Sequence, residues 1–251
     1  MTRIIMSGCN GAMGTTITKI VSEDAEAEIV AGIDIVDDGS KDYPVFSSIK
    51  DCDVEADAVI DFSTPKILDD LLAYCEEKKV PVVLCTTGYD EAQLAKIEEA
   101  SKKTAVLKSA NMSLGINTLM RLVQEAAKVL AAEGFDVEIV EKHHNQKRDA
   151  PSGTALALAD AVNEAMDNRY EYIFDRSGRR EKRGKKELGI SAVRGGTIVG
   201  DHDVIFAGTD EVVTFSHMAY SKAVFGKGAV AAAKFLNGKE SGRFDMADVI
   251  G

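Results

Sequence analysis

The segment EKHHNQKRDAPSGTA, residues 141–155, holds the densest group of side chains that could carry out chemistry. Two of the four histidines of the chain, His143 and His144, stand side by side here, and Lys147 follows closely. A histidine can donate a proton near neutral pH, and a lysine supplies a fixed positive charge or a second proton donor. The segment is therefore a candidate site of acid catalysis.

An anion receptor is expected directly after these residues. Ser152, Gly153 and Thr154 begin an expected helix, whose first N–H groups and two hydroxyl groups suit the carboxylate of a substrate. Two other interpretations stay open: surface histidines beside an ordinary helix cap, or a metal bound by the two histidines and Asp149. Adjacent histidines usually point apart, and no further ligand has suggestive spacing, so we expect no metal site.

A glycine-rich turn near the amino terminus indicates a second site. Gly8, Gly11 and Gly14 lie between an expected strand and an expected helix. Glycine lets the backbone approach a phosphate closely, and a helix start favours negative charge. Asp34, 20 residues after Gly14, can accept hydrogen bonds from both hydroxyls of an adenosine ribose. The pattern predicts dinucleotide binding, although a structural turn beside a solvated aspartate would share it.

The residues after Asp34 bear on the choice of nicotinamide cofactor. The 2′-phosphate of NADPH favours a nearby arginine or lysine. Here the chain continues with Ile35, Val36, Asp37 and Asp38. We therefore expect NADH or NADPH to bind, with NADH favoured.

Two further turns lie where strands of the same sheet should end. Cys85, Thr86 and Thr87 offer small side chains that suit a nicotinamide or ribose contact. Alternatively, one of the two threonines caps the helix that follows. Residues 109–112 end the next strand and could line the same pocket.

The elements that would position these groups alternate between strand and helix. Apolar runs predict strands at residues 3–7, 28–34, 56–63, 80–88 and 104–111, and helical spacing predicts helices at 12–21, 65–79 and 90–103. This order predicts an α/β fold with a Rossmann-like, doubly wound parallel sheet.

The regular alternation of strands and helices ends after residue 112. We expect helices at residues 113–132 and 152–166, a strand at 135–144, a solvated basic loop within 168–187, and three close strands between 188 and 218. Short turns between these strands predict an α+β domain with an antiparallel or mixed sheet. The expected domains are residues 1–112 for the dinucleotide and 113–218 for substrate and oligomerisation, with 219–251 returning to the first.

Composition narrows the classes of function. Of 251 residues, 45% are hydrophobic, and 41 acidic against 30 basic side chains give a net charge of -11. This charge opposes nucleic acid and anionic membranes, although the basic residues 176–186 leave nucleic acid as a weaker alternative. The four cysteines show no CxxC spacing, which favours reduced thiols. The first segment has too short an apolar run for a secretory signal, so we expect the protein in the cytoplasm.

Motifs along nearly the whole chain resemble those of dihydrodipicolinate reductases in order and approximate spacing. The HHxxKxDAPSGT pattern is highly specific, whereas the glycine turn is shared by many dehydrogenases. The matching motifs are GCNGAMG, DFSTP, CTTG, SANMSLGIN, EKHHNQKRDAPSGTA, AVRGGTIVGDHDVIFAG and FGKGAVAAAKFL.

This resemblance implies reduction of 4-hydroxytetrahydrodipicolinate, a small dicarboxylate, to tetrahydrodipicolinate in lysine biosynthesis, with loss of water. Hydride would reach C4 of the ring, and protonation would involve His143. By the same resemblance, Lys147 is the second catalytic residue, and His144, Gly153 and Thr154 bind substrate. A homotetramer joined through the sheets of the central domain is also implied.

The resemblance also implies a set of dinucleotide contacts. They are Gly8, Cys9, Asn10, Gly11, Ala12, Met13, Asp34, Cys85, Thr86, Thr87, Ser109, Ala110, Asn111 and Met112. Three positions depart from the usual pattern: Cys85 replaces a common glycine, Met112 a common phenylalanine and Lys222 a frequent arginine. The first two leave the cofactor preference open.

Two other functions would share part of this pattern. One is another NAD(P)H-dependent reductase of a small carboxylate, and turnover of the named substrate separates the two. The other is a non-catalytic module that senses NADH. Such a module gives no reason for the HHxxKxD segment.

Overall fold

The computed structural model describes residues 1–37 and 39–251, so Asp38, one of the acidic residues after Asp34, lies outside the described residues. The chain forms two compact units. Unit 1 combines Met1–Leu114 with Ala223–Gly251, and unit 2 is Gly115–Lys222. None of the helices in the described part of the chain has the length and apolar character needed to span a bilayer.

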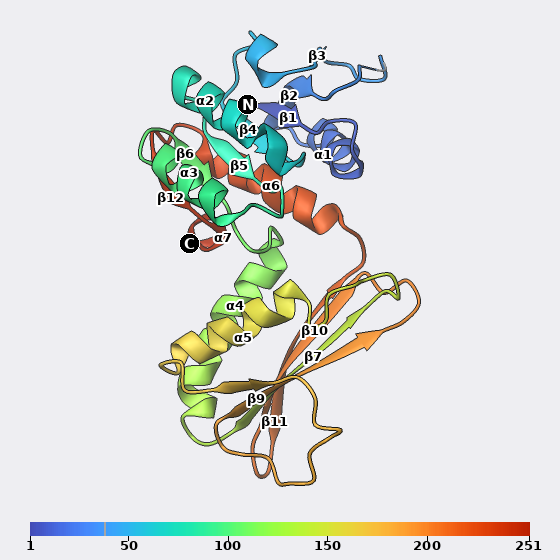
Figure 1. The fold of residues 1–251 in the computed structure, drawn as a ribbon, viewed down its shortest axis with the longest axis vertical. Coiled ribbons are helices and arrows are strands. Elements are labelled where there is room, and N and C mark those ends of the chain that lie inside the picture. Colours follow the sequence, from blue (N-terminus) through green and yellow to red (C-terminus); the bar gives the residue numbers. More distant parts are fainter. Residues whose placement is uncertain (38) are drawn as a thin grey trace. The chain divides into compact units, whose positions relative to one another are not determined.

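Unit 1 is built on a seven-stranded parallel sheet in the order β12-β6-β5-β4-β1-β2-β3 (Figure 1). Its strands are β1 (Thr2–Ser7), β2 (Ala27–Ile33), β3 (Val45–Phe46), β4 (Ala58–Asp61), β5 (Val82–Leu84), β6 (Ala105–Leu107) and β12 (Gly242–Phe244). The chain runs outward in one direction from β1 and in the other from β4. The expected doubly wound sheet is confirmed, and its switch point lies between these two strands.

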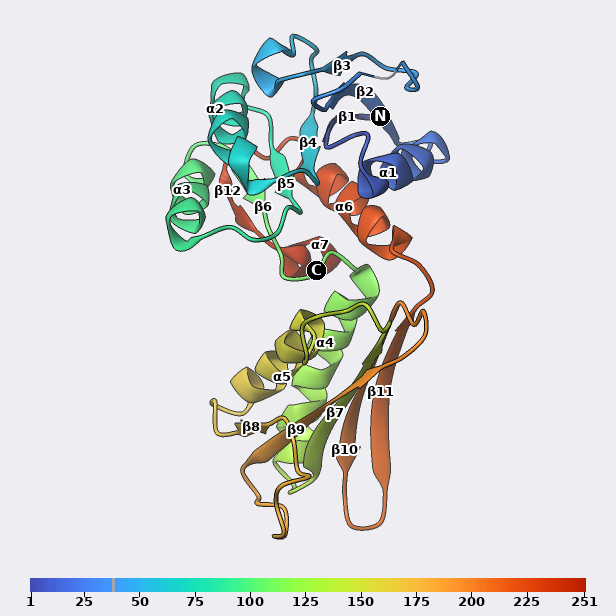
Figure 2. The same cartoon turned by 45° about the vertical axis from the view of Figure 1, so that its right-hand side comes forward.

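Helices cover both faces of this sheet, as Figure 2 shows. The helical segments are α1 (Ala12–Ser22), η1 (Ile49–Asp51), η2 (Pro65–Ile67), α2 (Leu68–Lys78), α3 (Glu91–Ser101), α6 (Ala223–Leu236) and α7 (Met246–Ile250). Along β1, Ile4 and Met6 pack in the core with α1 and α6, while Ile5 packs in the core with α2 and α3. Strands buried on both faces explain why the apolar runs lack alternation.

Small residues let α6 lie close against the rest of unit 1. A Cβ at Gly228 would lie 1.6 Å from the carbonyl oxygen of Met112. Ala229, Ala232 and Ala233 of the same helix are fully buried. After α6, β12 pairs in parallel with β6 and completes the sheet.

Unit 2 is a five-stranded mixed sheet with helices on one face. Its order is β11-β10-β7-β9-β8, in which β7 runs antiparallel to β10 and parallel to β9. The elements are α4 (Leu114–Ala126), the π-helical η3 (Ala127–Ala131), β7 (Asp136–His143), α5 (Gly153–Ala165), β8 (Glu171–Ile173), β9 (Glu187–Arg194), β10 (Gly200–Ala207) and β11 (Val212–Ala219). The expected mixed sheet is confirmed.

The register of unit 2 aligns polar residues on the helix-covered face. Glu141 of β7 pairs with His202 of β10, which in turn pairs with His217 of β11. Side chains alternate along a strand, so His143 shares this face with Glu141. Valines, leucines and isoleucines fill the same face further along the strands.

Some short elements differ from the sequence-based expectation. The expected loop within residues 168–187 is present, but β8 precedes it, and β3, β8, β12 and α7 have no counterpart among the expected elements. Two or three residues are too few to reveal a period, and these strands depend on pairing with longer neighbours.

Candidate active site

The glycine turn lies at the carboxyl end of β1, at the switch point of the sheet. Gly8 has φ +78, and a Cβ there would lie 2.4 Å from the carbonyl oxygen of Phe62. A Cβ at Gly14 would lie 2.2 Å from the carbonyl oxygen of Gly8. Both contacts require glycine, so the turn brings the start of α1 directly onto the strand end, where a pyrophosphate would bind.

Asp34 lies beside this turn. Its Oδ2 accepts a hydrogen bond from the backbone N–H of Asn10 at 2.9 Å, and its Oδ1 accepts one from Ile35 at 2.9 Å. The side-chain amide of Asn10 donates to the carbonyl of Val36 at 2.6 Å. The structure thus brings Asp34 and the glycine turn together, as dinucleotide binding requires.

A buried carboxylate, Asp61, organises the carboxyl ends of β1, β4 and β5. It accepts hydrogen bonds from the hydroxyls of Ser7 at 2.7 Å, Ser63 at 2.6 Å and Thr86 at 2.6 Å. Burial raises the pKa of Asp61 and outweighs the opposite effect of these hydroxyls. Thr86 also accepts from the N–H of Ser63 at 2.8 Å, so the turns after β4 and β5 are joined.

The capping interpretation of the CTTG turn is wrong. Asp90 caps α3 in a capping box with Gln93, and the Thr86 hydroxyl bonds to Asp61 instead. Thr87 is exposed. Cys85 is half-buried, and burial together with Asp61 raises the pKa of its thiol, which keeps the thiol protonated.

Other expected cofactor contacts differ in exposure. Ala12 and Ala110 are exposed, Met13 and Ser109 are half-buried, and Asn111 is buried. Cys9 and Met112 lie in the hydrophobic core of unit 1, where they can shape the site only through their backbone or through packing.

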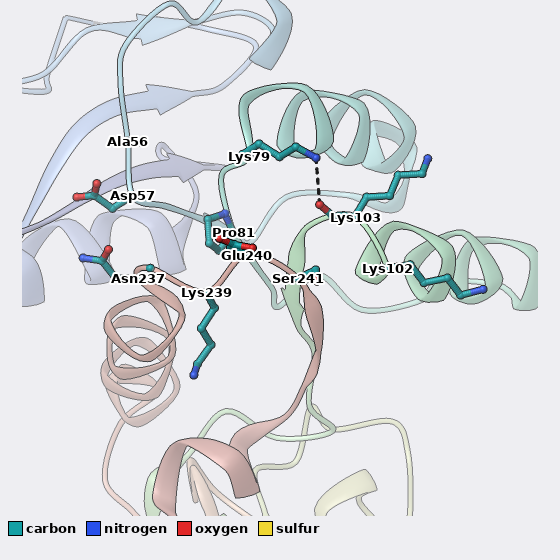
Figure 3. Close-up of a pocket in the computed structure, with 11 residues that line it drawn as sticks. Ala56, Asp57, Lys79, Pro81, Lys102, Lys103, Asn237, Lys239, Glu240 and Ser241 are labelled. Atoms are coloured by element: carbon teal, nitrogen blue, oxygen red, sulfur yellow. Dashed lines mark hydrogen bonds between the residues drawn. The ribbon is translucent and has the colours of Figure 1, made fainter.

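A cavity of about 760 Å³ in unit 1 lies at the amino ends of β4, β5, β6 and β12, on the side of the sheet away from the glycine turn (Figure 3). Its lining follows the ends of three helices, with Lys79 after α2, Lys102 after α3 and Lys239 after α6. Lysines at helix carboxyl ends balance the partial negative charge there. Since ligands of doubly wound sheets bind at the carboxyl ends of the strands, we do not assign the dinucleotide to this cavity.

The second group of site residues lies in unit 2, between the end of β7 and the start of α5. His143 is the last residue of β7 and is 8% exposed. Ser152 caps α5 by accepting a hydrogen bond from Ala155 at 3.1 Å, and Gly153 begins the helix. Thr154 is half-buried in its first turn. His143 is therefore not a surface residue beside an ordinary cap.

Glu141 connects these two ends. Its Oε2 lies 2.6 Å from Nδ1 of His143, and its Oε1 accepts from the backbone N–H of Ser152 at 3.0 Å. Arg194 donates to both oxygens at 2.7 Å. Burial would raise the pKa of Glu141, but hydrogen bonds from Arg194, His143 and Ser152 outweigh it and hold the pKa below its usual value.

Lys147 and His144 occupy the connecting loop. Lys147 forms an ion pair with Asp149 at 2.9 Å, which lowers the pKa of that carboxyl. The backbone N–H of Lys147 donates to the carbonyl of His144, whose side chain is half-buried. No group of three side chains suited to a metal converges anywhere in residues 1–37 and 39–251.

His202 lies beneath this loop with its ring 5.1 Å from that of His143, edge to face. Its Nε2 is 3.0 Å from the hydroxyl of Ser152. Burial, together with the neighbouring His143, lowers the pKa of His202 to about 4. Its ring is therefore neutral near neutral pH.

Glu141, Asp61, His202 and Arg194 were not among the predicted site residues. One signal could have identified Glu141. It lies two residues before His143 on the same strand, so both side chains must point to the same face of the sheet. Arg194 and His202 come from other strands, so only the register brings them to the site.

We expect the low pKa of His202 to destabilise the protein in acid. The unfolded chain binds a proton at this residue below about pH 6.5, whereas the folded chain does so only near pH 4, so stability falls as the pH falls through this window. His202→Gln can keep the hydrogen bond to Ser152. Urea titrations at pH 7 and at about pH 4.5 give the loss of unfolding free energy for each protein. The loss should be about 2 to 3 kcal/mol smaller in His202→Gln than in the wild type. Equal losses in both proteins would contradict this assignment.

Comparisons with known proteins cover the whole chain. Two family models, described as the amino-terminal and carboxyl-terminal parts of dihydrodipicolinate reductase, match residues 2–112 and 115–250. A 4-hydroxy-tetrahydrodipicolinate reductase from Caldanaerobacter subterraneus subsp. tengcongensis is 53% identical over 250 residues, which cover 100% of this chain and 98% of that protein. One from Clostridium tetani is 51% identical, covering 98% of this chain and 96% of that one.

Solved structures agree with this relationship. A dipicolinate-bound dihydrodipicolinate reductase from Paenisporosarcina sp. TG-14 superposes with a TM-score of 0.83 at 25% identity and full coverage of both chains. An amine dehydrogenase from Mycobacterium smegmatis, at 11% identity and a TM-score of 0.63 over 98% of this chain and 95% of that one, shares the fold. The chain belongs to the dihydrodipicolinate reductase family.

Proposed function

We propose that this protein reduces 4-hydroxy-tetrahydrodipicolinate to tetrahydrodipicolinate, with loss of water and oxidation of NADH or NADPH, on the route to diaminopimelate and lysine. The observation that carries the proposal is the buried His143 beside the start of α5, inside the most family-specific segment of the chain. Full-length relatives that carry this activity in their names support it.

The start of α5 is the proposed receptor for a substrate carboxylate. Gly153 and Thr154 place backbone N–H groups and the positive end of the helix dipole there, and Ser152, whose own N–H donates to Glu141, caps the helix. Lys147 offsets the charge of the substrate, and His144 lines the same loop. A related enzyme has been solved with dipicolinate, a flat ring with two carboxylates, which agrees with a receptor for anions.

His143 is the proposed proton donor. Its Nδ1 faces the carboxylate of Glu141, so Nε2 is the nitrogen left to deliver a proton to the substrate ring. When bound, the reduced nicotinamide would supply the hydride, which adds to C4 of the unsaturated ring that remains after the 4-hydroxyl has left as water. Proton delivery stabilises the electron density that moves toward the ring nitrogen.

Unit 1 is the proposed dinucleotide-binding part. The close turn at Gly8 and Gly14, with Asp34 hydrogen-bonded to the same turn, fits a pyrophosphate next to an adenosine ribose. The hydroxyl network around Asp61 holds the turn at Thr86, which is the proposed edge of the nicotinamide pocket.

We also propose that the enzyme works in the cytoplasm, which agrees with the four free cysteines of the chain.

Replacing His143 should remove proton delivery and leave dinucleotide binding intact. For His143→Ala we expect kcat to fall about 100-fold or more, because general acid catalysis contributes that much, while the dissociation constant for NADH stays within about twofold. The measurement is loss of NADH absorbance with freshly generated substrate, paired with fluorescence titration of NADH. A variant with unchanged kcat would remove His143 from the mechanism, and a wild type without turnover would refute the proposed function.

Cofactor preference can be tested at Asp34. Its carboxylate is the proposed acceptor for the ribose hydroxyls, so Asp34→Ala should raise the KM for NADH about tenfold and that for NADPH less. Burial raises the pKa of Cys9, and the charge of Lys41 partly opposes this rise, so Lys41 lies near the glycine turn and can favour a 2′-phosphate. Lys41→Ala should therefore raise the KM for NADPH and leave the KM for NADH unchanged. Equal effects of Asp34→Ala on both cofactors would contradict its role as discriminator.

A homotetramer joined through the sheets of unit 2 is the proposed assembly. The face of this sheet opposite α4 and α5 carries exposed Val193, Val212 and Met218. Met218→Asp should lower the molar mass measured by light scattering from that of a tetramer, whereas Leu94→Asp on α3 should not. A monomeric wild type would refute the proposal.

A further inference from the structure

Glu141 makes more polar contacts than any role assigned above requires. The side chain is fully buried, and each oxygen accepts two hydrogen bonds, from His143 and Arg194 at Oε2 and from Ser152 and Arg194 at Oε1. The four bonds tie three separate segments of unit 2 to one carboxylate.

Such a group is not explained by stability alone. Removing a carboxylate and a guanidinium from water is costly, and apolar residues of similar volume often fill such a site equally well. What an apolar side chain cannot do is accept hydrogen bonds from an imidazole and a backbone N–H at fixed positions. The contacts therefore favour a role in placing the groups that Glu141 touches.

The contact with His143 fixes which ring nitrogen carries the proton. An ionised carboxylate only accepts hydrogen bonds, so Nδ1 of His143 must donate to Glu141. This leaves Nε2 for the substrate. A Cβ at position 200 would lie 3.0 Å from that nitrogen, so the glycine at Gly200 keeps space in front of it.

The same carboxylate fixes the receptor. Its Oε1 accepts from the N–H of Ser152, the residue that caps α5. Arg194, held by Glu141 on both oxygens, also donates to the carbonyl of Asp149 at 2.6 Å and so supports the loop that carries Lys147.

We propose that Glu141 is a positioning residue, which keeps a proton on Nδ1 of His143, so that the protonated ring gives its proton to the substrate from Nε2 and remains as the neutral Nδ1–H form, and which joins His143 rigidly to the start of α5. This inference rests on the proposed function for its catalytic meaning. Proton donor and carboxylate receptor then keep one fixed spacing, matched to a ring that carries a carboxylate next to the nitrogen to be protonated. Arg194 keeps Glu141 charged and oriented.

The test compares Glu141→Gln with Glu138→Gln as a matched control. Glu138 lies on the same strand, also paired with an arginine, Arg183, but on the opposite face from His143. We expect Glu141→Gln to lower kcat about 100-fold, with the KM for NADH within about twofold, and Glu138→Gln to change neither. Glu141→Asp should recover part of the loss, because it keeps the charge.

Nitrogen-15 NMR of histidine-labelled wild type gives a readout that needs no activity. The neutral ring of His143 should show a protonated Nδ1 and an unprotonated Nε2. The opposite tautomer, or full kcat in Glu141→Gln, would overturn the inference even if the wild type is an active reductase. Failure of the wild type to turn over would instead count against the proposed function and leave the tautomer measurement decisive for Glu141.

Discussion

A carboxylate buried away from water is stable only if protein groups donate hydrogen bonds to it. At Glu141 this requirement fixes the geometry of unit 2 around the site. Donors come from the end of β7, the end of β9 and the cap of α5. Each is placed by ordinary packing of the sheet against α4 and α5. The ion pair with Arg194 keeps the carboxylate charged, so none of these segments can shift without leaving a buried charge unpaired.

Unit 1 uses a related device at the switch point of its sheet. Asp61 gathers hydroxyls from the ends of β1 and β5 and from the turn that follows β4. Here the donors are neutral and, within the described part of the chain, no arginine is paired with the carboxylate, which explains why burial raises the pKa of Asp61 while that of Glu141 is lowered. In both units, polar groups at strand ends are ordered by one buried acceptor.

Sequence patterns predicted the scaffold better than they predicted the two buried acceptors, Glu141 and Asp61. Buried runs and helical spacing were enough for the doubly wound sheet, the mixed sheet and the place of His143 between a strand and a helix. Thr86 was open to a capping role because a sequence shows which residues can cap, but not that Asp90 does so. Arg194 and His202 reach the site through strand register, which depends on packing of the whole sheet and not on local spacing.

The helix α6 gives unit 1 an unusual order of assembly. It packs on β1, β4 and β5, yet the ribosome makes it only after all of Gly115–Lys222 has been synthesised. Unit 2 is continuous and can fold while the chain is still growing. Until α6 emerges, only α1 covers this face of the parallel sheet, so part of the apolar surface that α6 later buries stays exposed on the nascent chain.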